Sequence, residues 1–529
     1  MTSRHTRVGA QPRKARKADW PKWVIDPDTV HLFEHNGDKM MLDIASGMVV
    51  EFSDFAYEFL SLCVGKTWPE VIRIVGDKYP GVTAEQMRET LDGLKARGLF
   101  KRPRRFSDWH REQRIRQLWQ HRPRRLQLVI AQCCNLSCVY CYMEKNQSNA
   151  RRLLMSREQA FQALDHLIKR SGRRRDLQVT FFGGEPLLNF ERIKEVVQYS
   201  KEMEKKHHKQ FIFELITNGT LLGGEIAEFV SEHDMLLFVS LDGWKEMHNK
   251  QRPSISGEDH HETILKNAQY MDQEYKRRKS RNTVKVRANL TPEFHDVKAV
   301  VEYLESRGFT TIGISAIQDL PYSEGRTPGA LPQEQALELG NDIEQMLLRG
   351  FERVKAGKSP SPYAGKMLHK MICSLSDYHS TLGIRCGVGR NTNAVDVDGN
   401  IYPCHRYVNM ENYILGNTKI GLDPKKTKAY YRKLIEATRR TCSDCWIRQF
   451  CAGGCPWERS APDGTICAPI SSECEHRRRG VEKALWLRKE LRKANPKLFD
   501  AWTRVGSDNH DSLDALEWSD PSTPLSERV

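Results

Sequence analysis

The sequence lacks any apolar run that approaches the ~20 residues of a membrane-spanning helix. No apolar stretch follows its basic first residues, so we expect no signal peptide, a cytoplasmic location and no membrane partner. No repeat at solenoid spacing is visible. The 529 residues are 39% hydrophobic and 29% charged, which favours a globular chain of several domains.

Excess charge is scarce outside two segments. Residues 1–25 carry a net charge of +6 and residues 101–125 carry +8, so these two segments hold all but one unit of the net +15. The nearly neutral remainder argues against nucleic acid as a partner. We interpret the two segments as a disordered arm and a linker that is helical around residues 109–119. A basic strip beside an anionic peptide is the functional alternative.

Residues 26–100 predict a small α+β module. Strand-like runs come first, separated by turns that hold Asn36-Gly37 and Ser46-Gly47. Capping boxes then begin helices after Thr67 and Thr83. Three short strands followed by helices predict a winged-helix-like fold. The strand-like runs are 30–33, 39–44 and 48–52.

From residue 126 onward, strand-like runs alternate with amphipathic helical ones. This order predicts an α/β fold in which a parallel sheet has crossover helices and is open or curled into part of a barrel. After it, residues 321–385 show one good helix near 333–348, and residues 386–480 are rich in cysteine and poor in periodicity. A charged helix follows near 481–493, and the last ~25 residues predict disorder. The six strand-like runs are 126–131, 177–182, 211–217, 235–241, 283–291 and 310–317.

Most of the fourteen cysteines gather in three short segments. A disulfide-rich secreted chain would be short and would carry a signal. Thiols grouped this tightly in a reducing compartment indicate metal or cluster ligands. The segments are 133–141, 386–404 and 442–474.

The first segment places Cys134, Cys138 and Cys141 within eight residues, directly after the first strand of the alternating region. A loop this short can wrap one cluster and leave the fourth iron open to a small chelating molecule. A zinc ion would need a fourth ligand at hand, and the adjacent Cys133 would point away.

Polar or glycine-rich motifs end the next three strands. Ligands bind at the carboxyl ends of strands in parallel sheets, so these motifs are candidate binding residues. Glycine lets the backbone approach a ligand, and a glutamate can accept a hydrogen bond from an ammonium group. The candidates are Gly183, Gly184 and Glu185 after the second strand, Asn218 after the third, and Ser240 and Asp242 after the fourth.

On these motifs, residues 126–317 resemble the radical S-adenosylmethionine (SAM) superfamily. The resemblance implies a partial (β/α)6 TIM-like barrel. It implies that Cys134, Cys138 and Cys141 hold a 4Fe–4S cluster whose open iron is chelated by the amino and carboxylate groups of SAM. The implied cofactor contacts are Gly183, Gly184 and Glu185 at the amino group, Tyr140 near the adenine, Asn218, Ser240 and Asp242 at the ribose and methionine end, and Arg252, which lies in a run resembling the peptide-modifying branch.

The later cysteines resemble the seven-cysteine pattern of SPASM domains, in which Gly399 stands between the first two. A zinc ribbon would explain a CxxC pair but not the other spacings. The resemblance implies two auxiliary 4Fe–4S clusters, so that the chain would carry three clusters. Whether Cys373 supplies a fourth ligand to the first auxiliary cluster is open, and Cys63, Cys133 and Cys467 are interpreted as packed thiols. The implied ligands are Cys386, Cys404 and Cys455 for the first auxiliary cluster, and Cys442, Cys445, Cys451 and Cys474 for the second.

Residues 26–100 resemble the precursor-recognition domain of peptide-maturation enzymes, on the turn at 43–47 and the helix end at 94–99. An exposed strand edge beside a helical groove would let a leader peptide add a strand. A winged-helix domain used for nucleic acid or for packing is the alternative.

Together, residues 26–480 resemble maturases of ribosomally made peptides, especially those that join a cysteine sulfur to a carbon atom. The segment 382–387 is similar to that of thioether-forming maturases, some of which act on a quinohemoprotein amine dehydrogenase subunit.

We therefore expect a radical SAM oxidoreductase that forms thioether cross-links. Its substrate would be a precursor peptide or small protein bound through its leader, and its electron donor a flavodoxin or ferredoxin. The alternatives are a formylglycine-generating sulfatase maturase, which usually lacks the recognition module, a carbon–carbon cross-linking maturase, and a nucleic-acid-modifying or nucleic-acid-binding protein. The expected domains are an arm at 1–25, a recognition domain at 26–100, a linker at 101–125, a radical SAM core at 126–320, a connection at 321–385, a SPASM domain at 386–480, and a helix with a disordered tail at 481–529.

Overall fold

The computed structural model describes seven stretches of the chain and divides it into two compact units, residues 1–105 and 106–529. The basic arm up to residue 22, residues 382–385 and the tail from residue 509 lie outside the described residues. The described stretches are 23–101, 108–145, 153–320, 327–375, 386–451, 453–469 and 471–508.

The first unit consists of an antiparallel sheet of order β1-β2-β3 followed by helices, as the sequence predicts. Both predicted capping boxes are present, at Thr67 and at Thr83. The buried core includes Met41 of the sheet and Leu60 and Leu91 of the helices. The elements are β1 (Val30–His35), β2 (Asp38–Asp43), β3 (Val49–Phe52), α1 (Asp54–Cys63), α2 (Trp68–Lys78) and α3 (Ala84–Ala96).

Within the described residues, the second unit holds one sheet of ten strands in the order β13-β12-β11-β10-β4-β5-β6-β7-β8-β9. The strands from β10 to β9 are parallel to one another, and β10 to β13 pair antiparallel. The predicted α/β class with a parallel sheet is confirmed. The strands are β4 (Arg125–Ala131), β5 (Asp176–Gly183), β6 (Gln210–Thr217), β7 (Leu236–Ser240), β8 (Lys285–Leu290), β9 (Thr311–Ala316), β10 (Thr392–Val395), β11 (Asn400–Tyr402), β12 (Gly416–Asn417) and β13 (Gly421–Leu422).

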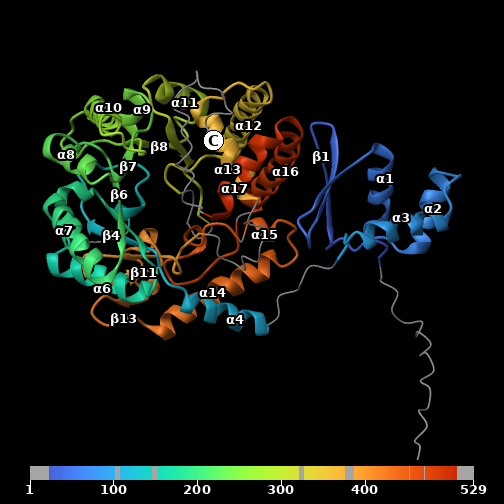
Figure 1. The fold of residues 1–529 in the computed structure, drawn as a ribbon, viewed down its shortest axis with the longest axis horizontal. Helices are drawn as coiled ribbons and strands as arrows, with labels where there is room; N and C mark the ends of the chain where they lie inside the picture. The colour runs from blue at the N-terminus through green and yellow to red at the C-terminus, as the bar shows by residue number, and fades with distance from the viewer. Residues whose placement is uncertain are drawn as a thin grey trace, which may run out of the picture. The chain divides into compact units, whose positions relative to one another are not determined.

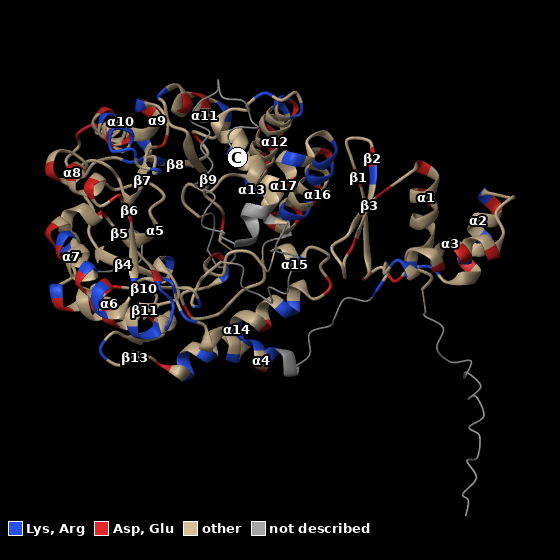
Figure 2. Ribbon diagram, in the orientation of Figure 1, with Lys and Arg blue, Asp and Glu red and all other residues tan. Residues whose placement is uncertain are grey.

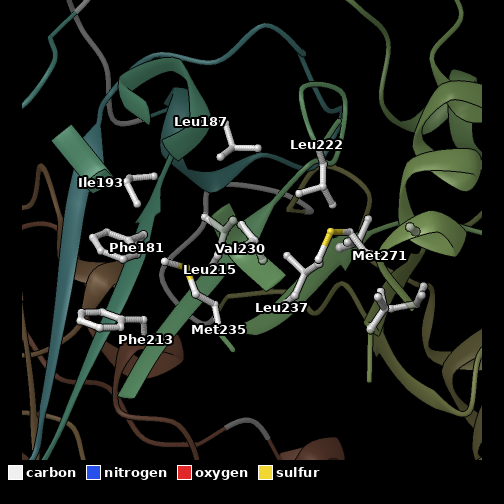
Figure 3. Close-up of a cluster of buried hydrophobic side chains, with 14 of the residues drawn as sticks. Phe181, Leu187, Ile193, Phe213, Leu215, Leu222, Val230, Met235, Leu237 and Met271 are labelled. Carbon is white, nitrogen blue, oxygen red and sulfur yellow. The ribbon is translucent and has the colours of Figure 1, made fainter. Parts of the chain in front are cut away.

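Helices cover the outer face of the curved parallel sheet (Figure 1). Alternate strand residues point into this layer, where Phe181 stacks on Phe213 with ring centroids 6.1 Å apart. Figure 3 shows these rings beside Leu215, Leu237 and Val230 in the buried cluster. The helices are α4 (Asp108–Gln120), α5 (Tyr142–Lys145), α6 (Arg157–Ser171), α7 (Phe190–His207), α8 (Gly224–Glu232), α9 (Lys245–Gln251), α10 (His261–Arg277), α11 (Val297–Ser306), α12 (Gln333–Lys355), α13 (Pro362–Ser374), α14 (Pro424–Cys442), α15 (Arg448–Cys451), α16 (Ser471–Ala494) and α17 (Pro496–Asp508).

The cysteine-rich region is continuous with this sheet. Strand β10 pairs with β4 across more than 250 residues of sequence, with Thr392 opposite Arg125. The segment predicted to be a linker also joins this part of the fold, because Ile115 and Leu118 of α4 are buried in a cluster with residues of α14. Helix α14 is a 19-residue amphipathic helix in a region where the sequence suggested little periodicity.

The carboxyl-terminal helices are longer than the sequence predicts. Helix α16 begins at Ser471, ten residues before the predicted start, and α17 continues to Asp508. Leu498 and Trp502 of α17 are buried, and apolar burial of this kind stabilises a helix whose composition is otherwise polar. Lys and Arg alternate with Asp and Glu over the outer helices (Figure 2). No described helix is both long and apolar enough to cross a membrane.

Candidate active site

The loop that carries Cys134, Cys138 and Cys141 is held by the last residue of α9 and the segment just after it. Ser137 N donates to Pro253 O at 2.8 Å, and Val139 N donates to Gln251 O at 3.0 Å. These bonds join two backbones in the manner of a short strand pair. The positions of the thiols at residues 134–141 are therefore set by backbone hydrogen bonds.

The two glycines at the end of β5 are required by close packing. A Cβ atom on Gly183 would lie 2.0 Å from Ala131 O, and one on Gly184 would lie 2.3 Å from Cys133 O. Gly183 also has φ +149°, which side-chain-bearing residues rarely adopt. We predicted that these glycines allow the approach of a ligand. The structure adds a second reason, because the end of β5 passes directly against the cysteine loop.

Glu185 connects the ends of two neighbouring strands. Its fully buried carboxylate accepts hydrogen bonds from Thr217 Oγ1 and Asn218 N, both at 2.7 Å, and from Leu187 N at 3.0 Å. Burial raises the pKa of Glu185 to about 7, although these hydrogen bonds oppose the shift. Asn218 Nδ2 lies 3.7 Å from Cys134 Sγ. The predicted residues Glu185 and Asn218 therefore form one network with the first thiol.

Asp242 is the centre of a second network. Its carboxylate accepts two bonds from Arg252, from Nε at 2.9 Å and from Nη2 at 3.0 Å. Gln251 Nε2 donates at 3.0 Å, Asn289 N donates at 2.9 Å, and the Tyr140 hydroxyl is a further donor. Both carboxylate oxygens are engaged by the protein. Asp242 thus positions Tyr140 and Arg252, a role that the sequence alone does not indicate.

Arg252 links this network to the cysteine loop. Its guanidinium lies 5.4 Å from the centroid of the Tyr140 ring, and Nη1 lies 3.9 Å from Cys138 Sγ. Ser240 ends β7 beside Arg287 of β8 and is part of neither the Glu185 network nor the Asp242 network. Except for Ser240, the predicted cofactor-contacting residues therefore surround the cysteine loop directly.

The thiols of the loop are close neighbours. Burial raises the pKa of Cys134 to about 12, with further contributions from the Glu185 carboxylate and from the thiols of Cys138 and Cys141. Among the described residues, no three His, Cys, Asp or Glu side chains converge closely enough to hold one metal ion.

The second cysteine set lines a cavity. The four thiols predicted to form one ligand set share it with Arg459, Arg477 and Cys455, a cysteine that the sequence assigned to the other auxiliary set. Burial raises the pKa of Cys442 to about 11, and its three partner thiols add to the shift while Arg459 opposes it. The four cysteines are Cys442, Cys445, Cys451 and Cys474.

The third set brings together Cys386, Cys404 and Cys455. Burial raises the pKa of Cys404 to about 12, and the other two thiols add to the shift. Cys373 is placed elsewhere, on α13, where its thiol donates to Trp502 O at 3.1 Å and lies 3.4 Å from His369 Nε2. The structure therefore brings three cysteines to this site and engages Cys373 in the packing of α13 against α17.

Several residues of these networks were not predicted. Thr217 and Gln251 are neighbours in sequence of Asn218 and Arg252, and their position beside predicted residues at a strand end or a helix end was the available signal. Arg459 follows Cys455 by four residues, and nothing in the cysteine spacing distinguishes it from a surface arginine.

Comparison with known proteins assigns the class. Residues 128–284 match the model of the radical SAM superfamily. A cysteine-type anaerobic sulfatase-maturating enzyme of Clostridium perfringens strain 13 is 24% identical over 342 residues, which cover 61% of this chain and 85% of the relative. The radical SAM cyclopropyl synthase TigE of Paramaledivibacter caminithermalis is 23% identical over 202 residues, which cover 36% of this chain and 40% of the relative.

A solved structure shares the fold. Native anSMEcpe with bound AdoMet and Cp18Cys peptide superimposes with a TM-score of 0.55 at 22% identity and covers 71% of this chain and 99% of its own. The chain thus contains a radical SAM domain and is an enzyme of radical chemistry. It is related to maturases that modify peptides and proteins, in particular to sulfatase-maturating enzymes. Its class implies a 4Fe–4S cluster and SAM, and the three thiols of residues 134–141 with the polar side chains of Asn218 and Arg252 beside them fit both.

Proposed function

We propose that this enzyme forms an intrapeptide thioether link between a cysteine sulfur and a carbon atom of a ribosomally synthesised peptide. When bound, SAM and its cluster supply a 5′-deoxyadenosyl radical that removes a hydrogen atom from a substrate carbon. In the proposed role, Cys134, Cys138 and Cys141 hold that cluster. Glu185 and Asn218 orient the amino-acid end of SAM from the ends of β5 and β6.

The residues around Asp242 complete the cofactor site in this proposal. Tyr140 and Arg252 are each hydrogen-bonded to the Asp242 carboxylate, so their side chains are fixed before SAM binds. Preorganised donors contribute to binding without a further cost of ordering. The Tyr140 ring is proposed to lie against the adenine, and the Gly183 and Gly184 backbone to approach the amino group.

The observation that carries the thioether assignment is the position of Cys373. In this proposal, a cluster at Cys386, Cys404 and Cys455 has three cysteine ligands, and the hydrogen bond from the Cys373 thiol to Trp502 O supports leaving Cys373 out of the set. An iron without a fourth cysteine can accept a sulfur ligand from the substrate. Thiolates are the preferred sulfur ligands of iron–sulfur sites, so a substrate cysteine suits this position.

The overall chemistry balances as a two-electron oxidation. The substrate loses one hydrogen atom from carbon to the 5′-deoxyadenosyl radical, and the thiol loses its proton. Formation of the sulfur–carbon bond then leaves one electron, and an auxiliary iron–sulfur cluster held by the later cysteines would supply the acceptor for it. The product is two hydrogens lighter than the precursor.

Formylglycine formation is the second candidate, and the similarity to a sulfatase-maturating enzyme over 85% of that relative favours it. Both candidates begin with removal of a hydrogen atom from a substrate carbon, so the fold does not separate them. A third candidate, a carbon–carbon link, would also reduce the mass by two hydrogens. The three products differ in the fate of the cysteine.

Mass spectrometry of a precursor peptide co-expressed with the enzyme separates these outcomes. We expect a loss of two mass units with one fewer alkylatable cysteine, because the sulfur becomes a thioether. A loss of two units with every cysteine still alkylatable would contradict the thioether and indicate a carbon–carbon link. A cysteine converted to an aldehyde would identify formylglycine instead.

The amino-terminal unit is proposed to bind the leader of the precursor. Its sheet order leaves β1 and β3 as edges, and β3 is only partly buried. Met48 beside β3 and Phe55 in α1 are exposed apolar side chains at 47% and 50%. A peptide that adds a strand to an edge gains backbone hydrogen bonds, and apolar neighbours provide side-chain contacts.

Removal of residues 1–105, at the boundary between the compact units, should weaken binding of the precursor at least tenfold. Cleavage of SAM to 5′-deoxyadenosine should continue, since the cysteine loop and both networks lie in the second unit. Fluorescence anisotropy with a labelled precursor measures the first effect, and chromatography of the reaction measures the second. Equal affinity of the full and truncated chains for the precursor would show that this unit has another role.

A further inference from the structure

Arg459 is a buried cation at the second cysteine set. Arg459 is the last residue of a 3-10 turn (Trp457–Arg459) just after the cysteine loop, and it is only 3% exposed. Nη1 donates to Thr438 Oγ1 and to Gly453 O, each at 3.1 Å, and Nε donates to Cys467 O at 2.9 Å. These acceptors are neutral, so they hold the guanidinium in place without balancing its charge.

No carboxylate pairs with Arg459 in the part of the chain that the structure describes. Its Nη2 atom is buried and has no hydrogen-bond partner among those residues. Taking a guanidinium out of water costs several kcal/mol unless an anion compensates it, and a buried donor left unpaired adds to that cost. The folded protein therefore needs a counter-ion at this position.

Two neighbouring arginines, unlike Arg459, have carboxylate partners. Arg477 is paired with Glu473 at 2.8 Å, and Arg478 lies 3.7 Å from Glu475. Both are on α16, where the ribbon in Figure 2 is blue at Lys and Arg positions. Of the three, Arg459 is the most deeply buried, and it has no acidic partner among the described residues.

Thiols are the main ionisable groups around Arg459, together with the Tyr407 hydroxyl. Arg459 lines the same cavity as the four cysteines of the second set. The Cys442 and Cys451 thiols act to raise the pKa of Arg459, and Arg459 in turn acts to lower the pKa of Cys442. The loop wraps closely around it, since a Cβ atom on Gly453 would lie 2.6 Å from Arg459 Nη1. Glu458 and Glu473 also line this cavity, but they pair with Arg406 and Arg477, which leaves a group held by the thiols to balance Arg459.

We propose that Arg459 is the built-in counter-ion of the cluster at Cys442, Cys445, Cys451 and Cys474, that its free Nη2–H donates to that cluster, and that it raises the cluster's reduction potential. The inference rests on the assignment of an auxiliary cluster to this set, and it is independent of the thioether product. A fixed positive charge and a charge-assisted donor stabilise the reduced, more negative state. Hydrogen bonds and charge near the sulfurs are established controls of cluster potential.

Arg459→Gln tests the proposal in the reconstituted full chain. The signal of this site is identified as the electron paramagnetic resonance signal that Cys442→Ala removes, and its midpoint is measured by redox titration. We expect the equilibrium for reduction to become at least tenfold less favourable in Arg459→Gln, which is a shift of about −59 mV for one electron. A midpoint equal to that of the wild type overturns the proposal.

Two further variants separate charge from folding. Arg459→Lys keeps the charge and should keep a midpoint closer to the wild type than that of Arg459→Gln, even if cluster retention falls. Thr438→Val removes a neutral partner of Nη1 and should leave the midpoint unchanged. Equal shifts in Arg459→Gln and Thr438→Val would reduce Arg459 to a structural role and overturn the proposal.

The exposed Arg479 provides the matched control, since its side chain is 69% exposed and pairs with Glu475. Arg479→Gln should not move the midpoint, because water screens its charge. A wild-type chain with no signal that depends on Cys442 would overturn the cluster assignment together with this inference. A shifted midpoint in an enzyme that makes formylglycine would support the inference and refute only the thioether proposal.

Discussion

Replacement of Cys134, Cys138 and Cys141 by alanine should abolish the formation of 5′-deoxyadenosine under reducing conditions. These thiols lie together on one loop that backbone bonds to residues 251 and 253 hold in place. Reductive cleavage of SAM needs an electron from the cluster at this loop, and the other cysteine sets are built from different segments. The triple variant should keep about two thirds of the iron, because two of the three proposed 4Fe–4S clusters remain.

Chromatography of the reaction mixture and iron analysis measure the two quantities. Cys133→Ala is the matched control, because Cys133 is adjacent in sequence and contributes its backbone oxygen to Glu185 N. This control should still form 5′-deoxyadenosine. If the triple variant formed as much product as the wild type, the first cluster would lie elsewhere. Iron equivalent to a single cluster in the wild-type chain would contradict the two auxiliary sites.

The proximity of neighbouring cysteines could be predicted because their spacing is a local property of the sequence, while their role as cluster ligands stays a prediction. Cys442, Cys445 and Cys451 are close along the chain, and the structure places them around one cavity. The alternation of strands and helices could also be predicted from the sequence, since crossover helices follow strands at short range. Strand β6, observed at Gln210–Thr217, was predicted at 211–217.

The contacts that could not be predicted are those between distant segments. Nothing in the sequence indicates that Thr392 lies opposite Arg125, or that the thiol of Cys373 bonds to Trp502 O. Such pairings depend on the packing of the whole unit. Asp242 illustrates the same limit, because its place at a strand end suggested contact with a ligand, whereas its carboxylate binds protein donors, among them Asn289 N.

Asp242→Ala should destabilise the second unit strongly. The substitution leaves the Arg252 guanidinium, which is 8% exposed, without its carboxylate. Breaking a buried ion pair from one side costs about 3–5 kcal/mol, because the remaining charge stays buried and uncompensated. Cleavage of SAM should fall at least tenfold, since Tyr140 loses its acceptor as well. Anaerobic urea denaturation followed by circular dichroism measures the free energy of unfolding.

The double variant Asp242→Ala/Arg252→Met shows whether the uncompensated charge is the cause. Removal of both charges should restore much of the lost stability, although the Gln251 and Asn289 donors left unpaired still cost about 1–3 kcal/mol each. Asp259→Ala is the matched control, because Asp259 forms a pair with Lys245 in which both side chains are more than half exposed. Exposed pairs contribute about 0–1 kcal/mol, so this control should unfold nearly as the wild type does. A double variant as unstable as Asp242→Ala would mean that the hydrogen-bond network, rather than the ion pair, carries the stability of this site. Loss of SAM cleavage in a double variant of restored stability would instead show that Asp242 or Arg252 serves the cofactor site itself.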